Sequence, residues 1–204
     1  MIYFDGPTKQ YASVGTIIKI DQYKSMPDGR IMVLCAGRSR FRVLDILRPE
    51  SDEIYCRVRA EIIDDDDDET SPSEAAAAAA EEADVWRLLQ QVLDQTNRLL
   101  GTGLQLKPSA QQLAPGGAGV PPSWEWYANT AIAAAAAAAA PSPALRRRLF
   151  SLEVAQVLAC PAGDLQRLLQ TRSTRRRLRM ERRMLGEATR MLSARIALKE
   201  AAPE

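Results

Sequence analysis

The spacing of apolar side chains changes along this 204-residue chain, from every second position to a helical repeat. Between residues 54 and 62 every second residue is apolar, the pattern of a strand with one buried face. From residue 85 to residue 100 apolar residues recur at about 3.6-residue spacing, the pattern of an amphipathic helix. The sequence therefore predicts an α+β fold, with a sheet in residues 1–63, an acidic linker in 64–84 and a helical subdomain in 85–204.

Four short strands are expected in the first part, at residues 14–23, 30–36, 40–45 and 54–62. The segment Met26-Pro27-Asp28-Gly29 combines residues that favour a tight turn, and Gly37 interrupts the pattern between the second and third strands. Because short connections join consecutive strands, an antiparallel β-meander is the simplest topology. The last strand is expected to be half-buried.

Helices joined by a Pro- and Gly-rich loop at residues 107–122 are expected in the second part. The first helix ends at Gly101, and Ser123 is the expected N-cap of a helix through an alanine tract. A further helix spans residues 144–159. The last helix, residues 173–200, carries two heptad-spaced stripes, typical of a coiled-coil seam or of a long helix lying on a bundle.

Charge is distributed in blocks, although the formal net charge is only +1. Residues 64–84 hold ten acids and no base, whereas residues 144–204 hold 14 bases and six acids. Contact between the two blocks is therefore possible within the chain. The run Asp64–Asp68 is interpreted as a solvated linker, because it lacks the spacing of a calcium-binding loop.

The residues argue against an enzyme, a metal site or a bound cofactor. Histidine is absent and the three cysteines form no CxxC pair, so a zinc site is not expected. Cys35 and Cys56 are interpreted as small buried thiols in strands. No phosphate-binding loop of the G-x-x-x-x-G-K-[ST] type is present, and no nucleophile and base are paired. The longest apolar run, residues 131–140, is too short to span a bilayer.

Three consecutive motifs in the strand region carry a family resemblance. They are Val14-Gly15-Thr16, then Pro27-Asp28-Gly29-Arg30, then Gly37-Arg38-Ser39-Arg40-Phe41-Arg42. In this order they resemble the N-terminal, substrate-binding domain of Lon protease, whose signature is Gly-x-x-Arg-Phe-Arg. The second half of the chain is similar to the helical part of that domain, including its long last helix.

The resemblance implies a partial PUA-like pseudo-barrel followed by a helical bundle. It implies a stand-alone, non-catalytic module that binds protein or unfolded polypeptide, in protein quality control. Only thirteen residues precede Val14, fewer than the family has, so a front-truncated or naturally short variant is expected. Analogy with stand-alone members of the family suggests a chloroplast location, with the cytoplasm as the alternative.

Two groups of residues are candidates for partner binding. Arginines on adjacent predicted strands could form a basic strip that contacts acidic peptides or the acidic linker, or a polar outer face with salt bridges. Two tryptophans could pack in the bundle or anchor a partner. The candidates are Arg38, Arg40, Arg42, Arg57, Arg59, Trp124 and Trp126.

The basic last helix suggests a second hypothesis, in which the chain contacts RNA or an anionic membrane surface. Seven arginines lie between Arg172 and Arg183. Phosphate neutralisation would drive such binding. Aromatic residues that stack on bases are missing there, which argues against nucleic acid as a partner and favours a charged outer helix face.

Overall fold

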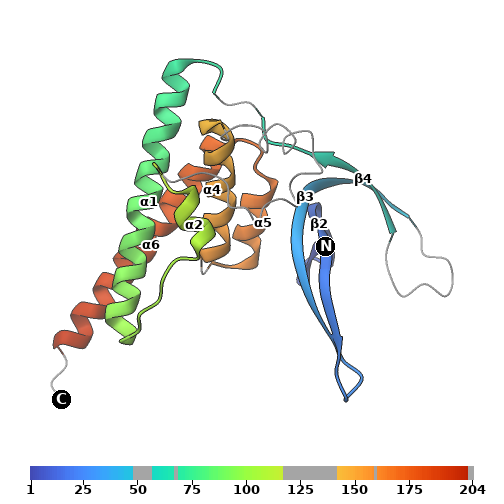
Figure 1. Ribbon diagram of the computed structural model, residues 1–204, viewed down its shortest axis with the longest axis horizontal. Coiled ribbons are helices and arrows are strands. Elements are labelled where there is room, and N and C mark those ends of the chain that lie inside the picture. The colour runs from blue at the N-terminus through green and yellow to red at the C-terminus, as the bar shows by residue number, and fades with distance from the viewer. Residues whose placement is uncertain (48–56, 67–68, 117–141, 159, 202–204) are drawn as a thin grey trace. The chain divides into compact units, whose positions relative to one another are not determined.

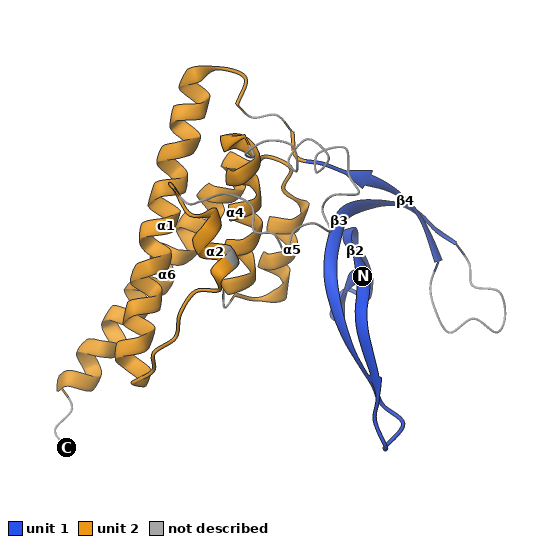
Figure 2. Cartoon of the chain, in the orientation of Figure 1, with its two compact units in different colours: residues 1–64 blue, residues 65–204 orange. Residues whose placement is uncertain are grey.

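The computed structural model describes residues 1–47, 57–66, 69–116, 142–158 and 160–201. The chain divides into two compact units, Met1–Asp64 and Asp65–Glu204 (Figure 2). The first contains the sheet and the second contains the helices, so the predicted α+β class is confirmed.

The first unit is a four-stranded antiparallel sheet in the order β1-β2-β3-β4. Its strands are β1 (Ile2–Asp5), β2 (Gln10–Ser25), β3 (Ile31–Leu47) and β4 (Arg57–Ile63) (Figure 1). Each strand pairs with the next along the chain, as the short connections predict. The antiparallel meander is therefore confirmed.

Two strands differ from the sequence-based boundaries. Strand β1 was not predicted, because four residues give too short a pattern to detect. Segments 30–36 and 40–45 are parts of one strand, β3, rather than two strands separated at Gly37. The register between β2 and β3 shifts where Gly37 pairs with Ile18 and Ser39 pairs with Ile17. Arg38 lies between these two pairs, so the strand continues past Gly37 through a β-bulge.

The turn between β2 and β3 forms as its residues predict. Gly29 has a φ of +84°, which favours glycine, and its N–H donates to the Met26 carbonyl at 3.1 Å. Asp28 accepts the Arg30 backbone N–H at 3.1 Å and pairs with its guanidinium at 2.6 Å. These contacts hold together the end of a long two-stranded hairpin.

The described helices of the second unit are α1 (Pro72–Leu100), α2 (Pro108–Leu113), α4 (Pro143–Val157), α5 (Ala162–Gln170) and α6 (Thr174–Ala201). Helix α1 begins with a reciprocal capping box, in which Ser71 accepts the Glu74 N–H and Glu74 accepts the Ser71 N–H. It ends at Gly101, whose φ of +65° is left-handed, as predicted.

Helices α1 and α6 run parallel to each other over most of their length. Hydrogen bonds join Arg179 to Glu81, Arg182 to Asp84 and Gln95 to Ser193, each across a separation of 98 residues. A constant separation requires both helices to run in the same direction. The last helix therefore lies along the first, rather than leaving its heptad stripes for a separate coiled coil.

The core of the helical unit lies between these helices and α2 and α4. Leu178 and Leu185 of α6 are buried there, with Val85 and Leu89 of α1 and Phe150 of α4. Helix α2 lies inside the segment predicted to be a loop. It forms because Leu106, Ala110 and Leu113 bury against this core, a tertiary contact that overrides the local proline and glycine content.

The predicted helix through the alanine tract, with its N-cap Ser123, lies outside the described residues. In the part of the chain that the structure describes, no helix is both long and apolar enough to cross a bilayer.

Candidate functional site

Four of the five candidate arginines share one face of the sheet. Register pairs Arg42 with Glu61 and Asp45 with Arg59, and an ion pair joins each couple, at 3.0 Å and 3.3 Å. Side chains alternate between faces along a strand, so Arg40 and Arg57 lie on the same face. The face is one of mixed charge rather than a purely basic strip.

The remaining candidates are placed differently. Arg38 falls at the β-bulge between the Gly37 and Ser39 pairings, outside the regular alternation. Arg40 is buried, which sequence reasoning did not anticipate for an outward-facing arginine. Trp124 and Trp126 lie outside the described residues.

Phe41, on the opposite face of the sheet, is buried against Gly15. The two residues are direct cross-strand partners, and Gly15 also pairs with Ile2 of β1. A Cβ at Gly15 would lie 2.6 Å from Phe41 Cζ and 2.6 Å from the Met1 carbonyl oxygen. Gly15 thus leaves space for the Phe41 ring, and this close contact lies where β1, β2 and β3 pair.

Much of the sheet's apolar surface is exposed. Ile62 of β4 is 68% exposed and Ile63 is buried instead, so the prediction of a strand half-buried on its Val58–Ile62 face is wrong for the described residues. The buried thiol predicted at Cys35 is also wrong, because Cys35 is exposed. Cys56 lies outside the described residues. Both wrong predictions assumed that the apolar side chains of the sheet pack on a core.

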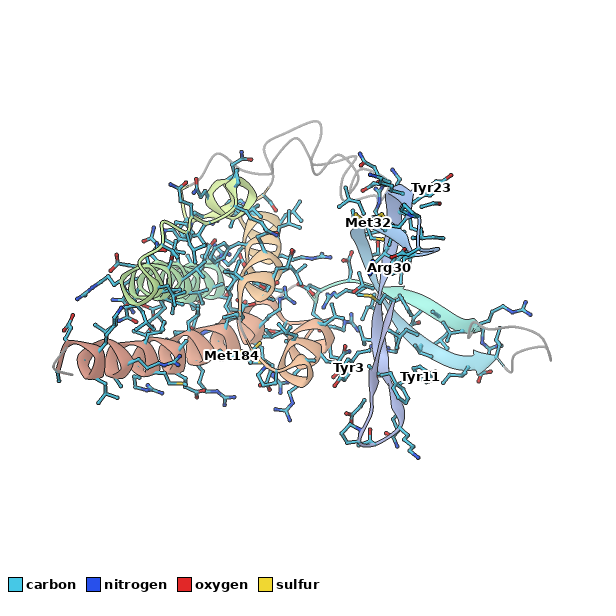
Figure 3. All side chains as sticks on the ribbon, turned by 90° about the horizontal axis from the view of Figure 1, so that it is seen from below. Tyr3, Tyr11, Tyr23, Arg30, Met32 and Met184 are labelled. Atoms are coloured by element: carbon cyan, nitrogen blue, oxygen red, sulfur yellow. The ribbon has the colours of Figure 1, made fainter. Side chains whose placement is uncertain are left out.

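In the far part of the β2–β3 hairpin, residues 17–25 and 31–36, the β3 strand is apolar on both of its faces. Met32 is 61% exposed and Leu34 is 59% exposed on one face of β3, with Ile31 and Val33 exposed on the other. Figure 3 shows Tyr23, Arg30 and Met32 extending from this hairpin. Sequence reasoning missed it as a site, although six consecutive apolar residues from Ile31 typify a strand covered on both faces.

The hairpin edges are also open among the described residues. Strand β1 covers β2 only as far as residue 16, through the hydrogen bonds between Thr16 and Met1. Strand β4 covers β3 only from residue 40 onward. Beyond these points the outer backbone groups of the described hairpin face no paired strand, the condition for adding one.

The acidic stretch contacts the basic tail, as the charge blocks suggest, but much of it is not solvated. Asp65 has a 3% exposed side chain and pairs at 2.6 Å with Arg177, which is fully buried. Thr174 donates to Asp65 at 2.9 Å, and Arg177 also donates to Ser151. The solvated-linker interpretation is wrong at Asp65, because its charge is neutralised and hydrogen-bonded inside the helical unit.

A second buried group of charges joins α1 to α4. Arg146 donates to Glu82 at 2.7 Å, and Arg147 pairs with both Glu82 and Glu69. The Glu82 side chain is only 2% exposed. Residues in the predicted linker therefore form part of the helical core.

Glu181 is the exception among these buried charges. It lies fully buried on α6, and neither of its carboxylate oxygens has a hydrogen-bond partner in the described structure. Burial raises the pKa of its carboxyl well above the ordinary value, against the opposing effect of the nearby Arg177 charge. No cluster of three or more potential metal ligands occurs within the described ranges.

An α+β fold with exposed apolar side chains beside open strand edges defines a class of domain that offers its sheet for protein contacts. Comparison with protein-family models gives the particular family. Residues 5–187 match the substrate-binding domain of ATP-dependent protease La (LON), and the chain belongs to this family. The matched domain binds substrate and is itself non-catalytic. A search of curated proteins found no match.

Proposed function

We propose that this chain captures extended, apolar segments of unfolded polypeptide on the β2–β3 hairpin, as part of protein quality control. The observation that carries the proposal is the hairpin of residues 17–25 and 31–36, within a substrate-binding domain. Its β3 strand is apolar on both faces, and both of its described edges are open. An extended segment would add as a strand and lay its side chains on these faces.

The size of the exposed apolar surface supports this occupant. Fully covering an aliphatic side chain contributes about 1.5–3 kcal/mol. Four such side chains lie in succession from Ile31 to Leu34. Backbone hydrogen bonds along an edge are independent of sequence, so this surface suits substrates that share apolar character rather than one motif.

The arginine face has a secondary role in the proposal. Arg42 and Arg59 are already paired with acids at the surface, where such pairs contribute little and exchange partners readily. We propose that they orient acidic flanks of a substrate rather than supply most of the affinity.

The alternative, contact with RNA or an anionic membrane through the last helix, has less support. Arg177 is fully buried, and Arg172, Arg179 and Arg182 pair with acids from residues 66–84. These arginines would have to leave their partners before neutralising phosphates.

The test is fluorescence anisotropy of the full chain with a labelled, permanently unfolded polypeptide such as casein. We expect the double variant Met32→Ser, Leu34→Ser to weaken binding at least tenfold, since tenfold corresponds to about 1.4 kcal/mol. The matched control is Met191→Ser, Leu198→Ser, which removes two exposed apolar side chains from α6.

Equal weakening in the hairpin and α6 variants would reject the hairpin as the binding surface. Absence of saturable binding by the unmodified chain would reject polypeptide capture itself. Unlabelled RNA, added as a competitor at low salt, displaces casein only if the basic helix is the site.

A further inference from the structure

A cavity of about 450 Å³ lies where α5 meets α6, within the helical unit. Most of the residues that line it are polar or charged, and Met180 is the one apolar residue among them. The lining residues are Asp66, Arg167, Gln170, Thr171, Arg172, Ser173, Arg176 and Met180. The volume is within the range of sites that hold small molecules.

Positive charge dominates this α5–α6 cavity. Three guanidinium groups line it, from Arg167, Arg172 and Arg176, against one carboxylate, from Asp66. Arg172 pairs with Asp66 at 2.6 Å, and Arg167 pairs with Asp164 at 3.4 Å in a solvent-exposed contact. Arg176 has no ion-pair partner among the described residues, so its charge is the one most available to a ligand.

Hydrogen-bond donors beside the arginines add to this character. Ser173 Oγ accepts the Arg176 backbone N–H at 3.0 Å, which leaves the hydroxyl proton available to donate. Gln170 contributes an amide from α5. The lining therefore presents donors from two elements around one space.

We propose that the α5–α6 cavity binds a small phosphate-bearing molecule through Arg167, Arg172 and Arg176. The planar guanidinium group matches the oxygen pairs of phosphate and carboxylate. The lining carries two positive charges in excess, three arginines against one aspartate. A phosphate monoester supplies nearly two negative charges at neutral pH and a carboxylate only one, so charge matching favours phosphate.

Asp66 has a definite part in this proposal. Its carboxylate occupies the Arg172 guanidinium that a phosphate would use, and its backbone N–H is held separately by the Arg172 carbonyl at 3.0 Å. Removing the side-chain charge therefore removes this ion pair from Arg172 and keeps the backbone contact. Asp66→Asn is expected to tighten phosphate binding about threefold to tenfold.

The experiment is calorimetric titration of the full chain with inorganic pyrophosphate and with acetate, at fixed ionic strength. We expect saturable binding of pyrophosphate and at least tenfold weaker binding of acetate. Arg176→Gln should weaken pyrophosphate binding at least tenfold. The matched control, Arg183→Gln, removes another exposed arginine of α6 outside the cavity and should bind as the unmodified chain does.

Circular dichroism checks that each variant is folded, and Asp66→Asn serves as a variant expected to gain affinity. Non-saturable binding, equal effects of Arg176→Gln and Arg183→Gln, or unchanged affinity in Asp66→Asn would overturn the proposal. Acetate binding as tight as pyrophosphate would overturn the assignment to phosphate. Because polypeptide capture is measured on a different unit, either proposal can fail while the other stands.

Discussion

In the sheet, Arg42 and Arg59 lie at the surface beside Glu61 and Asp45, whereas in the helical unit Arg177 is fully buried with Asp65. Apolar residues show the reverse distribution, since Met32 and Leu34 of the hairpin are exposed and Leu178 and Leu185 of α6 are buried. One unit thus keeps these charges and many apolar side chains at the surface, and the other buries both kinds of side chain. Mutations in the two units should therefore change the free energy of unfolding by different amounts.

The largest effect is expected at Arg177. Replacing it by alanine leaves Asp65 buried without its partner and removes the hydrogen bond to Ser151. The free energy of unfolding, measured in urea, should fall by about 3–5 kcal/mol. Arg183→Ala, at an exposed ion pair of the same helix, is the control and should change it by less than about 1 kcal/mol. Similar values for the two variants would contradict a buried Arg177.

A smaller loss is expected at Gly15 in the sheet. Alanine there would place a Cβ 2.6 Å from Phe41 Cζ and 2.6 Å from the Met1 oxygen. The cost should be about 1–3 kcal/mol, seen as faster amide exchange in β1, β2 and β3. Gly6→Ala meets no heavy atom within 4 Å and serves as the control. Unchanged exchange in Gly15→Ala would show that the sheet does not pack closely at this position.

A gain in stability is expected on replacement of Glu181, which is buried in the helical unit. Glu181→Met removes a buried carboxyl without a hydrogen-bond partner and should stabilise the unit by about 1–3 kcal/mol at neutral pH. Glu153→Met, at a buried carboxyl that accepts from Gln156, is the control and should not stabilise it. Thermal unfolding at several pH values measures both effects.

The pH dependence at Glu181 has a defined sign. The folded-state pKa is raised above the ordinary value of 4.5, so the folded chain keeps a proton that the unfolded chain releases. The contribution of this group to stability is therefore complete below pH 4.5 and falls as the pH rises toward the folded-state pKa. Glu181→Gln should flatten this slope, and an unaltered slope would mean that Glu181 is not its source.

The smallest effect is expected at Arg42. Its ion pair with Glu61 is about half-exposed, so Arg42→Gln should cost less than about 1 kcal/mol, and less still in high salt. Glu61→Gln should give the same loss, and the double variant should add little to it. A loss of several kcal/mol in the free energy of unfolding would mean that this surface pair contributes as much as the buried pairs of the helical unit. The two units would then not differ in this respect.

The motifs around Gly15, Gly29 and Phe41 allowed the sheet to be predicted, because turn and strand chemistry is local. The continuity of β3 through Gly37 was not predictable, since a bulge depends on the partner strand. Helix α2 and the burial of Asp65 required contacts with residues distant in sequence. The structure places four of the five candidate arginines on one face and pairs two of them with acids, which the salt-bridged alternative allows. The particular acidic partners and the open hairpin required knowledge of the strand register.

The parallel course of α1 and α6 has a consequence for synthesis. Partners that lie 98 residues apart cannot meet as a local helical hairpin. At about 5–20 residues per second, α1 leaves the ribosome about 5–20 seconds before the matching turns of α6. During that interval Val85 and Leu89 lack the surface that later covers them. The helical unit therefore stays incomplete for seconds during synthesis, while its first helix exposes apolar side chains.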